Sequence, residues 1–256
     1  MNRIQHKLSG NKKILSIYFS AGFPNLNDTK SLIENLAENG VDMIEIGLPF
    51  SDPLADGTII QASSTQALKN GMTSTLLFEQ LKDIRHTIEI PLIIMGYFNP
   101  ILQFGVENFL KKCQETGIDG LIIPDLPLDI YLSEYKELFE KYGVIMIFLV
   151  TPQTSEDRIR LIDANSNSFI YVVSSASVTG SRDSFDTNQL DYFERIANMN
   201  LKNPQIIGFG ISNKTTFEHA TKHQKGVIIG SSFIQFITNN DKSSISKYIQ
   251  NIVYIN

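Results

Sequence analysis

Cysteine, tryptophan and long apolar runs are scarce or absent in this 256-residue sequence. Cys113 is its only cysteine, which excludes an internal disulfide and a cysteine-based metal site and suits a reducing cytoplasm. No apolar run approaches the roughly 20 residues of a membrane-spanning helix. The N-terminal segment MNRIQHKLSG also lacks the apolar stretch of a signal peptide. We therefore expect a cytoplasmic protein that is not inserted in a membrane.

Basic clusters and nucleotide-binding motifs are absent as well. The formal net charge is −5 and no group of Lys and Arg stands out, so nucleic-acid binding is not expected. The sequence contains neither the dinucleotide motif G-x-G-x-x-G nor a P-loop, which argues against dinucleotides and nucleoside triphosphates. A hydrophobic content of 42% is nevertheless enough for a full core.

What the sequence does contain is an alternation of short apolar runs with helical patterns. Runs of four to seven residues, rich in Ile, Val, Phe or Tyr, are typical of buried parallel strands. They cover 14–20, 41–47, 91–97, 119–125, 144–150, 168–174, 204–210 and 226–230. Possible helix-capping residues precede several of the helical segments. These are Asp28, Thr73, Thr154, Asp186 and Ser212.

Eight strand–helix units in this length predict one (β/α)8 barrel domain over residues 1–256, with a short N-terminal helix. A doubly wound open sheet is the alternative, because periodicity does not show closure. In a barrel, the reactive groups lie at the C-terminal ends of the strands. No Lys or His stands at a predicted strand end, so a Schiff base and a metal site are not expected. His219 and His223 have a zinc-like spacing, but we interpret them as solvated histidines of an outer helix.

Glu45 is unusual because it lies inside an apolar run, in the stretch IEIGLPFSDPLADG (44–57). Side chains alternate along a strand, so Glu45 points into the barrel if Ile44 and Ile46 face the helices. An apolar surround would raise its pKa and let it act as both acid and base. The alternative is a structural glutamate paired with an arginine or a backbone donor.

Two aspartates and two glycine-rich segments complete the candidate site. Asp56 is either a site residue or the N-cap of a helix beginning at Thr58, and Asp125 is either a site residue or a cap near Leu128. The segments GFGIS and IIGSS follow strands seven and eight, and helix starts near Ser212 and Ser231 would offer free N–H groups to an anion. Such loops commonly bind phosphate in barrels, although a glycine also eases a tight turn. We expect a small phosphorylated substrate held by backbone.

At this point the sequence resembles the alpha subunit of tryptophan synthase over essentially its whole length. The motifs IEIGLPFSDPLADG, MGYFNPI, GLIIPDLP, YVVSSASVTG, GFGIS and IIGSS stand in family order and spacing. The resemblance implies retro-aldol cleavage of indole-3-glycerol phosphate to indole and glyceraldehyde 3-phosphate, without a metal or a cofactor in this chain. The sequence departs from the family pattern at Thr58, usually Pro, and at Ser177, usually Gly.

The resemblance also assigns roles to individual residues. It implies that Glu45 is the acid/base, that Asp56 accepts the indole N–H and that Tyr171 supplies a supporting hydroxyl. It places the phosphate on Gly180, Gly210, Gly230 and Ser231. It places four residues in or near the indole pocket and the subunit face, namely Tyr18, Met95, Tyr97 and Asp125. These roles suit the chemistry, because protonated indole is its own electron sink and needs no lysine imine or metal.

The family pairs with a beta subunit that bears pyridoxal phosphate, in an alpha2-beta2 heterotetramer that converts the indole to tryptophan. We expect the partner loop to include Pro49, Phe50, Asp52 and Pro53, unless Phe50 only packs beneath the loop. Two other functions are possible: another phosphate-binding barrel of aromatic amino-acid biosynthesis, and a non-catalytic allosteric barrel. The absence of a strand-end Lys argues against indole-glycerol-phosphate synthase, and the presence of Glu45 and Asp56 argues against the non-catalytic barrel.

Overall fold

The computed structural model describes residues 2–174 and 185–253. Within these residues, parallel strands form one sheet with the order β5-β4-β3-β2-β1-β9-β8-β7-β6. The strands are β1 (Ile14–Ser20), β2 (Met43–Gly47), β3 (Leu92–Met95), β4 (Gly120–Ile122), β5 (Ile145–Ile147), β6 (Leu149–Val150), β7 (Ile170–Val173), β8 (Gln205–Gly208) and β9 (Gly226–Ile229). Each lies within one of the apolar runs that the sequence analysis identified as strands.

The sheet closes on itself through the segment 145–150. Its first half, β5, pairs with β4, and its second half, β6, pairs with β7. Only Phe148 separates the two halves, and its carbonyl accepts a hydrogen bond of 2.9 Å from the Tyr171 N–H. β5 and β6 are therefore two parts of the fifth barrel strand, which the sequence predicted as one run. The (β/α)8 barrel is confirmed, and the open-sheet alternative is wrong.

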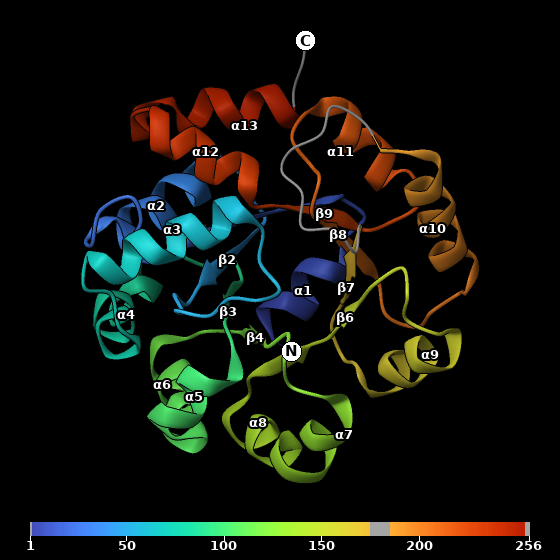
Figure 1. Cartoon of the computed structure of the whole chain (residues 1–256), viewed down its shortest axis with the longest axis horizontal. Helices are drawn as coiled ribbons and strands as arrows, with labels where there is room; N and C mark the ends of the chain where they lie inside the picture. The colour runs from blue at the N-terminus through green and yellow to red at the C-terminus, as the bar shows by residue number, and fades with distance from the viewer. Residues whose placement is uncertain (1, 175–184, 254–256) are drawn as a thin grey trace.

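Helices surround this barrel on the outside (Figure 1). The outer helices are α2 (Asp28–Glu38), α3 (Thr58–Lys69), α4 (Ser74–Leu81), α5 (Phe98–Phe104), α6 (Val106–Thr116), α7 (Leu128–Ile130), α8 (Lys136–Tyr142), α9 (Glu156–Asn165), α10 (Thr187–Asn198), α11 (Lys214–Thr221), α12 (Ser231–Asn239) and α13 (Ile245–Val253). Shorter helical turns are η1 (Ile84–His86), the π-helical η2 (Tyr131–Tyr135) and η3 (Lys242–Ser244). No helix of the described residues is long and apolar enough to span a membrane.

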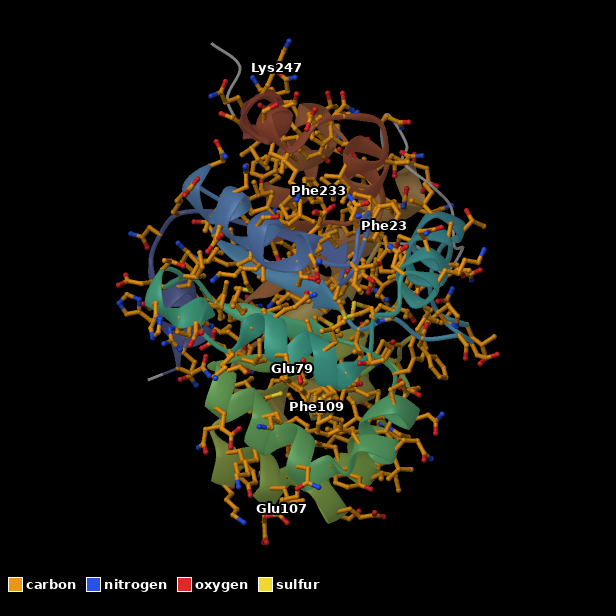
Figure 2. All side chains as sticks on the ribbon, turned by 90° about the vertical axis from the view of Figure 1, so that its left-hand side faces the viewer. Phe23, Glu79, Glu107, Phe109, Phe233 and Lys247 are labelled. Carbon is orange, nitrogen blue, oxygen red and sulfur yellow. The ribbon has the colours of Figure 1, made fainter. Side chains whose placement is uncertain are left out.

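The apolar side chains of the helices are mostly buried and the charged ones are mostly exposed, as the apolar periodicity predicts. Phe109 of α6 and Phe233 of α12 are fully buried between their helices and the strands, whereas Glu107 and Lys247 lie at the surface (Figure 2). Burying aromatic and branched aliphatic side chains on both faces of the strands gives a parallel sheet its main stabilisation. The core therefore has two parts, one inside the barrel and one between the barrel and the helices.

The N-terminal helix α1 (Arg3–Ser9) covers one end of the barrel, and it lies at the centre of the view in Figure 1. Ile4 is fully buried, and its Cδ1 is so close to Gly120 that a Cβ there would approach it to 2.9 Å. The Asn2 side chain donates to the Asp119 carbonyl (2.9 Å), and the Gln5 side chain donates to the Asn167 carbonyl (2.9 Å). These carbonyls precede β4 and β7, so α1 closes the N-terminal end of the barrel.

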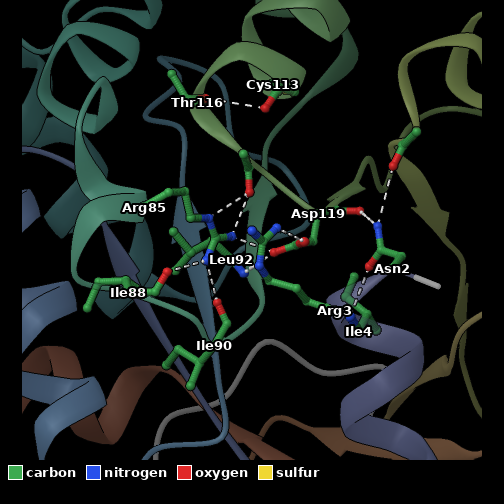
Figure 3. A network of polar contacts seen from close by, with 12 residues as sticks. Asn2, Arg3, Ile4, Arg85, Ile88, Ile90, Leu92, Cys113, Thr116 and Asp119 are labelled. Carbon is green, nitrogen blue, oxygen red and sulfur yellow. Dashed lines mark hydrogen bonds and ion pairs between the residues drawn. The ribbon is translucent and has the colours of Figure 1, made fainter.

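Asp119 holds this closed end together (Figure 3). Its carboxylate accepts from the Leu92 N–H (2.9 Å) and forms ion pairs with Arg3 (3.1 Å) and Arg85 (2.5 Å). The Arg85 guanidinium also donates to the carbonyls of Gly117, Ile88 and Ile90. A buried carboxylate is tolerated when charge and hydrogen bonds compensate its lost hydration, as they do here.

We predict unequal costs for removing the two arginines that share Asp119. The Arg85 side chain is only 16% exposed, so Arg85→Ala leaves a buried carboxylate short of its main cation and should lower the free energy of unfolding by roughly 3 kcal/mol. The Arg3 side chain is 46% exposed, and Arg3→Ala should cost at most about 1 kcal/mol. Urea denaturation of the two variants measures both values. Equal losses would show that Arg85 has no special role in compensating Asp119.

Candidate active site

A pocket lies at the opposite end of the barrel, where the strands have their C-terminal ends. The empty space inside it is about 490 Å³ when the open mouth is included. Its lining consists of Tyr18, Ile60, Met95, Tyr171, Phe209, Gly210, Ile211, Ile228, Gly230, Ser231 and Ser232. A smaller pocket, lined in part by Phe50, Asp56 and Tyr97, adjoins it because Tyr18 and Met95 line both. The two pockets together form the candidate site.

Glu45 lies beneath the floor of this site, in the interior of the barrel. Its side chain is fully buried, and its Oε1 accepts a hydrogen bond of 3.1 Å from the Ser16 hydroxyl of β1. Its Oε2 is buried without a hydrogen-bond partner, and no ion pair of the described residues includes Glu45. The structural alternative, a glutamate paired with an arginine or a backbone donor, is therefore wrong. Burial raises the pKa of Glu45 to about 8, and the Ser16 hydroxyl opposes this shift.

Two tyrosine rings form the floor above Glu45, and each lies against a glycine of the neighbouring strand. A Cβ at Gly47 would meet the Tyr18 hydroxyl at 2.2 Å, and a Cβ at Gly208 would meet the Tyr171 hydroxyl at 2.0 Å. Burial raises the pKa of both phenols, and the nearby charge of Glu45 adds to the effect. Since both tyrosines also line the large pocket, they lie between Glu45 and the ligand space.

Asp56 is the second acid of the site and approaches it from the loop between β2 and α3. It is buried, and burial raises its pKa to about 6, while a hydrogen bond with the Tyr97 hydroxyl lowers it. The same hydroxyl accepts from the Ala55 N–H at 2.8 Å, so Tyr97 fixes the loop at this point. Gly57 is the N-cap of α3 and no side chain caps that helix, so the helix-cap interpretation of Asp56 is wrong.

Asp125 lies at the rim rather than in the lining. It is exposed, and neither pocket includes it. Its Oδ1 accepts a hydrogen bond of 2.8 Å from the N–H of Phe98, and Phe98 is the first residue of α5. It therefore caps a different helix from the one near Leu128 that the sequence suggested, and α7 has no side-chain cap. Its charge still contributes to the raised pKa of Tyr97, after burial and Asp56, so it lies near the small pocket.

The helices that follow the two glycine-rich segments differ in whether a side chain caps their N-terminus. α12 begins at Ser231 with Gly230 as its N-cap, and no side chain caps its first turn. Gly230, Ser231 and Ser232 line the pocket, so the uncapped end of α12 faces ligand space. The sequence expectation for Ser212 is wrong, because α11 begins at Lys214 and Asn213 caps it through the Thr216 N–H (2.9 Å). Helix dipole and free N–H groups together favour an anion at α12.

Residues 4–256 match the family model described as tryptophan synthase alpha chain. The tryptophan synthase alpha chain of Flavobacterium psychrophilum is 71% identical over 98% of this chain and 100% of its own length. That of Flavobacterium johnsoniae is 67% identical over the same shares. The crystal structure of the alpha subunit from Legionella pneumophila superposes with a TM-score of 0.87 at 30% identity, covering 98% of this chain and 97% of that one.

The chain belongs to the tryptophan synthase alpha chain family. Its reaction is the lyase cleavage of indole-3-glycerol phosphate. The other phosphate-binding barrels of aromatic amino-acid biosynthesis are thereby set aside.

Several residues that line the large pocket were not predicted from the sequence, and Phe209 is the clearest example. It is the second residue of GFGIS, it lines the pocket, and its φ of 71° lies in the left-handed region. Its ring packs edge-on against Tyr171 at a centroid distance of 6.3 Å. A non-glycine residue with positive φ costs backbone energy and often marks a functional site. A bulky residue between two glycines was the available signal.

The predicted partner loop divides into a packed part and a displayed part. Phe50 is half-buried and packs against Tyr97 at 5.3 Å, and its N–H donates to the Ser64 hydroxyl (2.9 Å). The alternative that Phe50 packs beneath the loop is thus the one that the structure favours. Pro49 is buried and Pro53 half-buried, whereas Asp52 is exposed. Leu54, the next residue of the loop, is 89% exposed.

Gly180 and Ser177 lie outside the described residues. Thr58, the other departure from the family pattern, is the first residue of α3 and is exposed. His219 and His223 are both exposed, and the described part of the chain contains no group of three or more His, Cys, Asp or Glu that could hold a metal ion.

Proposed function

We propose that Glu45 and Asp56 divide the chemistry of this lyase through their different protonation states. The observation that supports this is the pair of raised pKa values, about 8 for Glu45 and about 6 for Asp56. At neutral pH the first carboxyl is mainly protonated and the second mainly ionised. Two carboxyls whose surroundings separate their pKa values are well suited to act as an acid and as an electrostatic stabiliser.

The proposed reaction follows from these states. Protonated Glu45 gives its proton to C3 of the indole, which makes the ring an electron sink and places positive charge on the ring nitrogen. The Asp56 carboxylate accepts the N–H and stabilises that charge. The Glu45 carboxylate then removes the proton of the hydroxyl next to the ring as the carbon–carbon bond breaks, releasing indole and an aldehyde. Glu45 must turn toward the pocket for these steps, and Tyr171 can support it with its hydroxyl.

We place the substrate phosphate at the uncapped N-terminus of α12, with Gly210, Gly230 and Ser231 around it and Gly180 as a further proposed contact. Tyr18, Met95 and Tyr97 would then line the indole end, with Asp125 at the rim. The N-terminus of α12, which favours an anion, and the aromatic side chains lie in different parts of the site, and this separation supports the orientation. Because the indole supplies the electron sink, the proposal needs no cofactor in this chain.

We further propose that this chain delivers indole to a beta subunit that carries pyridoxal phosphate, within an alpha2-beta2 assembly. One related structure, 31% identical with a TM-score of 0.84 and covering 95% of this chain and 99% of that one, is a chain of the tryptophan synthase complex of Pyrococcus furiosus. In this chain, Leu54 and Asp52 are displayed on the loop that leads to Asp56. The free, buried Cys113 suits a reducing compartment, so we place the enzyme in the cytoplasm.

The acid/base role is tested by Glu45→Gln, which keeps the size of the side chain and removes its titratable proton. Indole release from indole-3-glycerol phosphate should fall by about 10²–10⁴-fold, the usual contribution of a general acid/base. Circular dichroism checks that the barrel is intact. Indole release close to the parent rate would exclude Glu45 as the proton-transfer group.

The phosphate position is tested by Gly230→Ala. Gly230 does not have a positive φ, and an added Cβ would lie 3.4 Å from Tyr18, so the substitution is free of backbone strain but intrudes on the pocket. We expect calorimetric affinity for glyceraldehyde 3-phosphate to fall roughly tenfold. Gly10→Ala, at the far end of the barrel, is the control and should bind as the parent does. Parent-like binding by Gly230→Ala would mean that the phosphate lies elsewhere.

The docking surface is tested by Leu54→Ser. Because Leu54 is 89% exposed, its removal should leave the basal lyase rate of the isolated chain nearly unchanged. Affinity for the beta subunit should fall by at least about fivefold, the effect of losing one apolar anchor of roughly 1 kcal/mol. The control is Leu161→Ser on α9, 43% exposed in the parent chain and distant from the loop in the sequence. Equal affinity of the two variants would contradict the docking role.

A further inference from the structure

Ser16 is the one hydrogen-bond partner of Glu45 that the described residues provide. Both side chains are fully buried, and the Ser16 hydroxyl donates to Glu45 Oε1 at 3.1 Å. The bond joins neighbouring strands: in the register of β1 with β2, Tyr18 lies opposite Glu45 and Ser16 lies opposite Met43. Ser16 is thus two residues below Tyr18 on the same inward face of β1.

The two carboxyl oxygens of Glu45 differ in their hydrogen bonding. Oε1 has its donor, whereas Oε2 is equally buried and has none. A buried polar atom without a partner is costly, and a catalytic role is one reason for which such an atom is retained. Of the buried side-chain oxygens without a partner in the described residues, Glu45 Oε2 is the one that lies beside the candidate site. Ser16 does not line either pocket, so it is not placed to touch a ligand.

We infer that Ser16 is a positioning residue for Glu45: its hydroxyl holds one carboxyl oxygen and leaves the other for proton exchange with the substrate. The inference rests on the proposed acid/base role of Glu45. A serine hydroxyl can donate to the carboxylate or accept from the carboxylic acid, so it can remain a partner while Glu45 changes protonation state. An apolar residue at position 16 would leave both oxygens without a partner.

The other groups around Glu45 do not substitute for Ser16. Opposite Glu45 on β3 is Ile93, and opposite Ser16 on β9 is Ile228, and neither has a polar side-chain atom. The titratable groups that face it are the phenols of Tyr18 and Tyr171, both of which remain neutral at neutral pH because burial raises their pKa. The Asp56 carboxyl interacts with the same two phenols, and it can only repel a second negative charge.

Removing the hydroxyl should therefore raise the pKa of Glu45, because a donor that favours the charged form is lost. In Ser16→Ala we expect the titration midpoint of Glu45 to rise by roughly one pH unit, the size expected for a hydrogen bond to a charged group. In the proposed mechanism, activity declines at high pH as Glu45 loses its proton, and this upper limb should move upward by the same amount. The lower limb, which reports Asp56, should stay in place.

At neutral pH the Glu45 carboxylate formed during the reaction would lack its donor. The kcat of Ser16→Ala should then fall roughly tenfold with little change in KM, because an interaction of the reacting state is lost rather than one of substrate binding. A purely structural role for Ser16 would lower stability without moving the pH limb.

The experiment combines two measurements. Infrared difference spectroscopy follows the Glu45 carboxyl in the substrate-free chain, with Glu45→Gln identifying its band. The pH dependence of kcat/KM is measured by indole release. Ser16→Thr keeps the donor and should restore the parent midpoint, and Ser16→Cys fills the same space with a weak donor and should behave like Ser16→Ala. Ser20→Ala is the matched control, since Ser20 is buried on the same strand but hydrogen-bonds to Ser63 (2.7 Å) and to Tyr18 instead of to Glu45.

The two measurements separate the inference from the proposed function. An unmoved carboxyl midpoint in Ser16→Ala and Ser16→Cys, or an equal shift in Ser20→Ala, would overturn the positioning role. A shifted carboxyl midpoint together with a shifted upper limb supports it. A shifted carboxyl midpoint with an unmoved rate profile would overturn the catalytic part of the inference. If Glu45→Gln is then also active, the proposed function has failed as well.

Discussion

Closure of the sheet at Phe148 is the constraint on which the site depends. Three strands, β1, β9 and β8, separate β2 from β7 in the sheet, so an open sheet would hold Glu45 and Tyr171 far apart. In the closed barrel both residues point into one interior, and the charge of Glu45 influences the Tyr171 phenol. Closure works because the segment 145–150 changes its partner from β4 to β7 within a single strand. Every candidate site residue acquires its neighbours from this topology.

Side chains fill the barrel interior between Glu45 and the pocket and leave the pocket open. Tyr18 and Tyr171 fill this interior by lying across Gly47 and Gly208, where any larger residue would collide with their hydroxyls. Glycine in a strand usually weakens it, because it contributes no side chain to packing. Here the adjacent rings occupy the space that the missing side chains leave. This arrangement excludes water from Glu45, which raises its pKa, while the two tyrosines beside it also line the ligand space.

Much of this fold could be predicted from the sequence, because burial on both faces of a parallel strand leaves short, nearly continuous apolar runs. The strands and the inward direction of Glu45 followed from that pattern and from alternation. Features that depend on contacts distant in sequence could not be predicted: the break at Phe148, the capping of α5 by Asp125 and the packing of Phe50 on Tyr97. The helix N-caps could be predicted only in part. Thr73 and Asp186 are caps as expected, whereas Ser155 and Asn213 cap helices one residue after the predicted positions, because neighbouring polar residues compete for the same role.

The two ends of the barrel treat buried carboxylates in opposite ways. At the N-terminal end, Asp119 forms ion pairs with Arg3 and Arg85, and Asp42 forms ion pairs with Lys7 and Lys12. Through Arg3 and Lys7 the two acids link α1 to the strands. At the C-terminal end, Glu45 has a hydroxyl but no cation. Glu45 has a raised folded-state pKa, so its contribution to stability is fully present below the unfolded pKa and is lost as the pH rises through about 8. A cation beside Glu45 would remove that loss, but it would also hold the carboxyl ionised and prevent it from donating a proton. The ion pairs of Asp119 and Asp42 lie at the opposite end of the barrel, where the proposed reaction needs no carboxyl that donates a proton.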